Sequence, residues 1–154
     1  MKRYEKWIFP VISLAAGALG GFLGKQGMQE VYPMLQKPAL TPPAIVFPIV
    51  WFVLYVLMGI GMARVWQTQA LDRGQALGIW SAQLVVNVLW TVLFFAQQKY
   101  LAALWLLVVL WLLILGMILL FRRFDRTAAW MQIPYLLWVS FAGYLNWGIW
   151  MLNR

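Results

Sequence analysis

The chain contains no cysteine and no histidine. Without cysteine there is no disulfide framework, zinc cluster or thiol nucleophile, and without histidine the usual metal ligand and general base are missing. Charged residues are also scarce, at 10% of 154 residues, and only four of them are acidic. A soluble domain carries about a quarter charged residues, so this chain cannot cover itself with a polar surface. With 64% hydrophobic residues and a mean hydropathy of +0.78, the chain is predicted to be an integral membrane protein.

Five apolar segments are long enough to cross a membrane, because a span needs about 20 residues at a rise of about 1.5 Å each. None of them alternates apolar and polar residues strictly, as a barrel strand does, and lipid offers no partner to unpaired backbone groups. The pattern therefore predicts an all-α membrane protein, a single five-transmembrane-helix bundle over residues 1–154. The expected spans are 7–24, 44–66, 77–97, 101–121 and 129–152.

The connection at 26–43 is the only long one between these spans. Long connections in compact folds are more often lids or binding loops than idle linkers. With Tyr32 and Pro42 it could cap a cavity, and the alternative is a plain solvated loop. The first span could be read as a cleaved signal peptide, but Gly17 and Gly21 form a small-xxx-small pair that fits a retained, closely packed helix.

The basic residues set the expected orientation. The positive-inside tendency places the amino terminus in the cytoplasm and the carboxyl terminus and the connection 26–43 outside. The lack of a transit peptide before the first span favours a bacterial cell membrane over a mitochondrial outer membrane. The net charge of +8 does not indicate a nucleic-acid partner, because the basic residues stand singly or in short clusters between apolar runs. On the expected inner side are Lys2, Arg3, Lys6, Arg64, Arg73, Arg122, Arg123 and Arg126, and on the outer side are Lys25, Lys37, Lys99 and Arg154.

Polar residues inside the spans are few and uncharged. No Asp, Glu, Lys or Arg falls near the middle of any span, which argues against an ion-coupled transporter. Gln83 and Asn87 lie on the third span, and Ser140 and Asn146 on the fifth. Spacings of three and four residues place three sets of side chains each on one helix face. The sets are Phe47, Trp51, Tyr55 and Met58; Gln83, Asn87, Trp90 and Phe94; and Tyr135, Trp138, Ala142 and Asn146.

These three faces reach similar depth in the membrane. At about 1.5 Å per residue, Trp138 and Trp51 lie within roughly 6 Å of the height of Asn87. Two interpretations stay open. The faces could enclose a cavity for a flat, largely apolar ligand held by stacking and a few hydrogen bonds, or they could be helix–helix contacts with the amides as polar links.

Three sequence blocks carry a family resemblance: KPALTPP with VW..LY.LMG at 37–59, AQLVVNVLWTVLFF at 82–95, and PYLLWVSFAGYLN at 134–146. With these blocks in this order, the chain resembles the TspO/MBR family, the bacterial relatives of the mitochondrial translocator protein, or peripheral benzodiazepine receptor. The resemblance implies a five-helix membrane fold, a homodimer, and a pocket beneath the first long loop. It also implies binding of porphyrins and of isoquinoline carboxamide and benzodiazepine-type ligands.

The resemblance also implies which residues form the pocket. Trp51 and Trp138 match the tryptophans that the family associates with porphyrin chemistry, so they are the candidate catalytic residues. Combined with the three helix faces, it gives the candidate ligand-binding residues Tyr32, Pro42, Phe47, Trp51, Tyr55, Gln83, Asn87, Trp90, Trp138, Ala142 and Asn146. Tyr144 is followed by no basic residue until Arg154, so the cholesterol-recognition pattern of animal members is incomplete here.

Two classes of function follow from this resemblance. Some family members break down protoporphyrin IX in light and oxygen, so the chain could be an enzyme whose indole rings hold or reduce the macrocycle. The alternative is a non-enzymatic porphyrin carrier, scavenger, stress sensor or transporter that uses the same residues. No metal site and no tightly bound cofactor are expected, and without His or Cys as axial ligands a metal-free porphyrin is favoured over haem.

Overall fold

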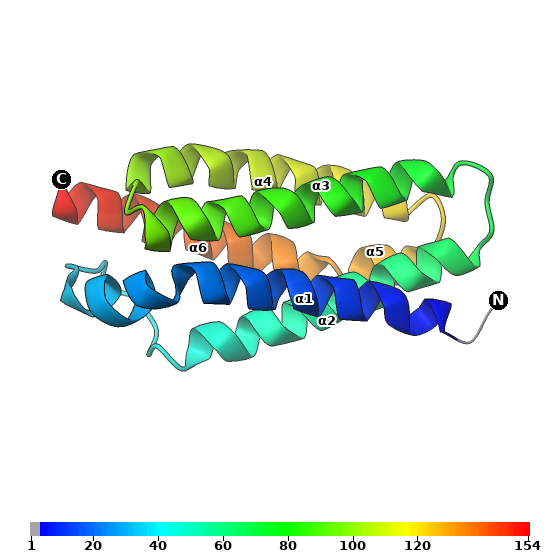
Figure 1. Cartoon of the computed structure of the whole chain (residues 1–154). Helices are drawn as coiled ribbons and strands as arrows, with labels where there is room; N and C mark the ends of the chain where they lie inside the picture. The colour runs from blue at the N-terminus through cyan, green and yellow to red at the C-terminus, as the bar shows by residue number, and fades with distance from the viewer. Residues whose placement is uncertain (1–3) are drawn as a thin grey trace.

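The computed structural model describes residues 4–154, and the regular structure in this range is entirely helical. Five long helices lie side by side and form one bundle (Figure 1), which confirms the predicted all-α architecture. Four shorter helical elements extend or connect them. The long helices are α1 (Glu5–Gln26), α2 (Val46–Gln67), α3 (Arg73–Thr91), α4 (Tyr100–Phe121) and α6 (Ile133–Asn153); the short ones are η1 (Gly27–Val31), η2 (Tyr32–Met34), η3 (Val92–Ala96) and α5 (Arg126–Trp130).

Four helical stretches of this range have the length and apolar composition to cross a membrane: Glu5–Met34, Val46–Gln67, Arg73–Ala96 and Tyr100–Phe121. Helix α6 is as long, with 21 residues, and lies among the other four (Figure 1). It carries tryptophans, tyrosines and Asn146, which favour interfaces or polar partners over plain lipid contact.

Two boundaries differ from those expected from the sequence. Helical structure continues from α1 through η1 and η2 to Met34, so the irregular connection predicted for 26–43 begins only at Leu35. A side chain at Gly27 would collide with the backbone carbonyl of Phe95, so glycine allows the π-helical turn to pass against η3. At the other end, the predicted fifth span 129–152 is divided into α5 and α6, and Pro134 occupies the first turn of α6, where its missing N–H costs nothing.

Helices α1 and α2 pack most closely near the N-terminal half of α1. Gly59 of α2 lies directly against the backbone of Pro10, and the hydroxyl of Ser13 donates a hydrogen bond of 2.7 Å to the backbone carbonyl of Tyr55. The hydroxyl satisfies a buried polar group that lipid could not satisfy. This contact fixes the position of Tyr55 along the bundle axis relative to α1, and with it the position of Trp51, one turn away on α2.

Candidate ligand-binding cavity

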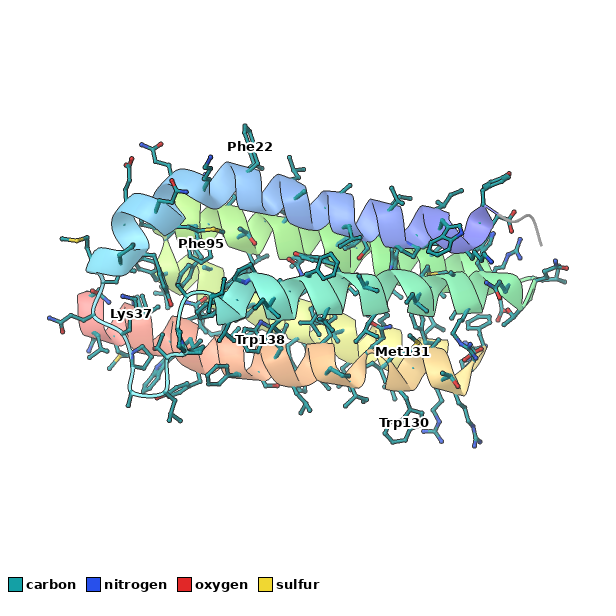
Figure 2. The ribbon with its side chains drawn as sticks, turned by 90° about the horizontal axis from the view of Figure 1, so that it is seen from below. Phe22, Lys37, Phe95, Trp130, Met131 and Trp138 are labelled. Atoms are coloured by element: carbon teal, nitrogen blue, oxygen red, sulfur yellow. The ribbon has the colours of Figure 1, made fainter. Side chains whose placement is uncertain are left out.

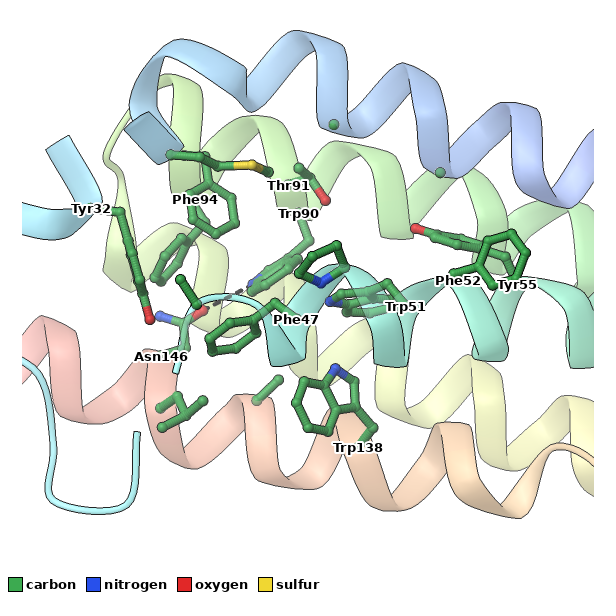
Figure 3. A pocket seen from close by; sticks show the side chains of 18 of the residues that line it. Tyr32, Phe47, Trp51, Phe52, Tyr55, Trp90, Thr91, Phe94, Trp138 and Asn146 are labelled. Carbon is green, nitrogen blue, oxygen red and sulfur yellow. Dashed lines mark hydrogen bonds between the residues drawn. The ribbon is translucent and has the colours of Figure 1, made fainter. Parts of the chain in front are cut away.

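A cavity of about 490 Å³ lies between α1, α2, α3 and α6, in the half of the bundle next to η2 (Figure 3). Its size falls in the range of roughly 300–1,000 Å³ that is typical of small-molecule sites. Most of its wall is apolar or aromatic. It is lined by Leu14, Gly17, Ala18, Gly21, Met28, Tyr32, Ala44, Phe47, Pro48, Trp51, Phe52, Tyr55, Trp90, Thr91, Phe94, Phe95, Trp138, Ala142, Leu145, Asn146 and Ile149.

Most of the residues expected from the sequence meet in this cavity, although they come from distant parts of the chain. Those that line it are Tyr32, Phe47, Trp51, Tyr55, Trp90, Trp138, Ala142 and Asn146. Pro42, Gln83 and Asn87 are not among its lining residues. Pro42 lies in the connection between η2 and α2, and the two amides are buried in α3 behind the aromatic wall.

Trp51 stands at the centre of the aromatic wall. Its ring is stacked on that of Tyr55 with centroids 5.6 Å apart, and it lies 6.3 Å from the ring of Trp90. Tyr135 meets it edge-on at 6.2 Å. Offset and edge-to-face arrangements at these separations are the favourable ones for aromatic pairs, so Trp51 is held from three sides.

The hydrogen bonds behind this wall explain the role of the two buried amides. The hydroxyl of Tyr55 donates to Asn87 Oδ1 at 2.8 Å, and Asn87 Nδ2 donates to the hydroxyl of Tyr135 at 2.7 Å. The Tyr135 hydroxyl in turn donates to Gln83 Oε1 at 2.7 Å. The amides are therefore paired with protein groups, and they position the two tyrosines that flank Trp51 rather than facing a ligand.

The indole N–H groups of the cavity differ in an informative way. Trp90 Nε1 donates to Asn146 Oδ1 at 3.0 Å (Figure 3). Trp138 Nε1 is buried and finds no hydrogen-bond partner among the residues that the structure describes. Its ring meets Phe47 edge-on at 5.8 Å. A buried donor without a partner is costly, so the protein leaves one polar group of the cavity wall unsatisfied.

The connection between η2 and α2 is tied to the end of α6. The N–H of Gln36 donates to Asn153 Oδ1 at 3.0 Å, and Asn153 Nδ2 donates to the Gln36 carbonyl at 2.7 Å. The ring of Tyr32 meets that of Phe47 at 6.2 Å and carries Lys37 Nζ 4.9 Å from its centroid. These contacts bring the connection to the cavity's end.

Sequence reasoning missed the α1 side of the cavity. Leu14, Gly17, Ala18 and Gly21 line it, whereas the glycine spacing indicated only a close helix contact. The sequence carries no signal that separates Gly21 from a contact glycine, since it stands four residues from Gly17. In the structure an added Cβ at Gly21 would meet nothing within 4 Å in the described part of the chain, so Gly21 does not serve helix contact.

A bundle of long apolar helices that encloses an aromatic cavity defines the class: a multi-pass helical membrane protein with an internal small-molecule site. The chain belongs to the TspO/MBR family, whose model matches residues 9–151. It is 37% identical over 146 residues to the tryptophan-rich protein TspO of Chlorobaculum tepidum, covering 92% of this chain and 91% of that one. It is 36% identical over 148 residues to protein CrtK of Rhodobacter capsulatus, covering 95% and 91%. With the translocator protein of Bos taurus it shares 32% over 155 residues, covering 96% and 92%.

Proposed function

We propose that this protein binds a metal-free porphyrin such as protoporphyrin IX in the cavity between α1, α2, α3 and α6. The observation that carries the proposal is the meeting of Trp51, Trp90 and Trp138, from three helices, around one cavity. A flat macrocycle offers two faces for stacking on such rings. The other small apolar ligands implied by the sequence, of the isoquinoline carboxamide and benzodiazepine types, would use the same wall.

The few polar groups fit the edge of such a ligand. The unpaired N–H of Trp138 can donate to a nitrogen or carbonyl acceptor, and such a hydrogen bond contributes about 1 kcal/mol. Lys37, which lies over the ring of Tyr32, provides a positive charge near the end of the cavity for a porphyrin carboxylate. We propose that this end faces outward from a cell membrane and that the protein acts as a homodimer.

Binding can be measured by the quenching of tryptophan fluorescence as protoporphyrin IX is added to purified protein. We expect saturation at one ligand per chain. Trp105→Phe is the matched control, because Trp105 is 67% exposed on α4, outside the cavity. Replacement of Trp138 by Phe should weaken binding, and Trp105→Phe should leave the affinity at the wild-type value. Equal affinities in all three proteins would contradict the proposed site.

A second candidate function is the light-dependent breakdown of the bound porphyrin. It is favoured by the position of Trp51 and Trp138, whose oxidisable rings both line the cavity. Light excites the porphyrin, and O2 supplies both oxygen atoms that add across a double bond of the macrocycle, so the step needs no further reductant. The two rings would hold the macrocycle during this addition, and the cavity would exclude water.

Illumination under oxygen separates the enzyme from a carrier, scavenger or sensor. We expect loss of the porphyrin Soret band with wild-type protein and slower loss with Trp51→Phe and Trp138→Phe, each corrected for the fraction of ligand bound. Equal loss in all three would remove the catalytic role and leave the binding function standing.

A further inference from the structure

The wall of the cavity is incomplete on one side. Among its lining residues, those contributed by α3 and α6 are buried or half-buried, whereas Ala18 of α1 and Pro48 and Phe52 of α2 are exposed. The side chain of Phe52 is 59% exposed although it borders the cavity. The cavity therefore reaches the surface of the bundle between α1 and α2.

The separation of α1 and α2 increases from the start of α1 toward its end. The surroundings of three glycines show this increase. Gly59 is pressed against the backbone of Pro10, and Gly17 lies under the ring of Tyr55. At Gly21, one turn further along α1, an added Cβ would meet nothing within 4 Å among the described residues. Figure 1 shows the same divergence, with the start of α2 turned away from α1. The two helices thus touch at one end and leave an opening at the other.

The rim of this opening is apolar on both helices. Ala18 on α1 and Phe52 on α2 line the cavity and are exposed, and on the outer surface of α1 Phe22 is 75% exposed and points away from the bundle (Figure 2). Gly21 lies inside the apolar stretch 7–24 of α1, toward its C-terminal end, and Lys25 follows one turn later. Such a rim belongs at the depth of the lipid hydrocarbon rather than in water.

We propose that ligands enter and leave the cavity sideways from the bilayer, through the opening between α1 and α2 that Gly21 keeps clear. The inference rests on the proposed binding function. It restricts the ligands to molecules that first dissolve in lipid, such as a porphyrin or another flat apolar compound. The end of the cavity toward water is covered instead, because Asn153 ties the connection at Gln36 to α6.

A reversible block of the opening tests this route. The chain has no cysteine, so in Gly21→Cys a benzyl methanethiosulfonate reagent attaches a ring at this position alone, and a reductant removes it. Protoporphyrin IX binding and release are followed by stopped-flow tryptophan quenching in proteoliposomes. We expect the label to slow association and dissociation, each by about tenfold, and reduction to restore both rates.

The matched control is Gly78→Cys on α3, treated in the same way, because a Cβ at Gly78 also meets none of the described residues within 4 Å and Gly78 does not line the cavity. Its rates should not change. If the cysteine protein cannot be labelled, Ala18→Trp fills the same opening and should slow both rates without a reagent. A blocked route slows both directions, whereas a lost binding contact speeds dissociation alone, and that second outcome would overturn the proposal.

The competing route enters the cavity from its water-facing end, beneath the connection between η2 and α2. Asn153→Ala removes the tie to Gln36, so on that route both rates should rise, while the label at Gly21 should have no effect. That combination would overturn the side entrance and leave the binding site intact. If wild-type protein does not quench with protoporphyrin IX at all, the proposed function itself fails.

Discussion

The two halves of the bundle treat the same residue types differently. In the closed half, the side chains of Met58, Trp80 and Phe121 are at most 2% exposed. Trp80 Nε1 donates a hydrogen bond to the Met58 carbonyl at 3.1 Å. In the open half, around the cavity, Trp138 Nε1 has no partner in the described range. Trp80 is thus a packing residue whose N–H the protein satisfies, whereas Trp138 lines the cavity with an unsatisfied N–H.

The difference arises from small residues on α1 and α2. In the closed half Gly59 lets the backbone of Pro10 approach directly, so no space remains for a ligand. In the open half a Cβ added at Gly21 would meet no atom of residues 4–154 within 4 Å, and the helices diverge from there. The close contact between Gly59 and Pro10 holds α1 and α2 together in the closed half. The same two helices can therefore lie apart around the cavity in the open half.

The largest expected effect comes from filling the tight contact. Gly59→Leu places a side chain against the backbone of Pro10, which cannot move aside, so we expect a loss of about 3 kcal/mol or more in unfolding free energy. Gly21→Leu, in open space, should stay within about 1 kcal/mol of wild type, since leucine favours helix over glycine. Thermal unfolding in detergent measures both. Equal effects would break the distinction between the two halves.

The buried amide network behind the aromatic wall comes next in size. Asn87→Leu removes the acceptor of the Tyr55 hydroxyl and a donor to Tyr135, so we expect a loss of about 2 kcal/mol. Gln75→Leu is the control, on an exposed face of the same helix. Thermal unfolding measures stability, and porphyrin titration shows whether Trp51 is still held. A destabilisation no larger than that of the control would mean that the network contributes nothing.

A third pair of variants separates packing from binding. Trp80→Phe should cost about 2 kcal/mol of stability, since it removes volume and a hydrogen bond from a filled site. Trp138→Phe should cost less stability, yet weaken protoporphyrin IX binding by about fivefold through the lost N–H. Unfolding curves and titrations of both proteins give the comparison. The assignment of roles is wrong if Trp80→Phe weakens binding more than Trp138→Phe does.

The smallest effect lies at the far end of the closed half, where Asp125 caps α5. Its carboxylate accepts from the Ala128 N–H at 2.9 Å and pairs with Arg64 at 3.2 Å. Burial alone would raise the pKa of Asp125, but the hydrogen bonds from Ala128 and Arg64 lower it below its usual value. Loss of a cap costs about 1 kcal/mol, so Asp125→Ala should lower the unfolding midpoint modestly at neutral pH.

The sign of its pH dependence follows from that lowered pKa. A carboxylate with a lower pKa in the folded state stabilises the fold above its unfolded pKa, and the contribution is lost as pH falls through the folded pKa. Wild type and Asp125→Ala should therefore differ at pH 7 and converge in acid below the ordinary aspartate range. A constant difference at every pH would show that the charge plays no part.

Much of this architecture could be predicted from the sequence. Apolar length alone indicates the helices, and helical spacing places Trp51, Tyr55, Trp138 and Ala142 on inward faces, because periodicity is a local property of the chain. The hydrogen-bond partners of Asn87 could not be predicted, since its amide binds tyrosine hydroxyls from two other helices. Such partners depend on tertiary packing.

The first connection shows the same limit. Its prolines indicated a loop from residue 26, yet the chain stays helical to Met34, and Gly27 lets this helical stretch lie against the carbonyl of Phe95. The divergence of α1 from α2 at Gly21 was likewise hidden, since a glycine in close contact and a glycine at an opening look alike in sequence. Only the neighbouring helix tells them apart.

The central claim is that a flat ligand occupies the space between the indole rings, and filling that space tests it most directly. Ala142 is buried on the cavity wall, so Ala142→Phe should place its ring where the ligand lies. Ala102→Phe, exposed on α4, is the control. We predict that protoporphyrin IX affinity falls by about a hundredfold in Ala142→Phe and stays at the wild-type value in the control. Wild-type affinity in a folded Ala142→Phe protein would contradict the account.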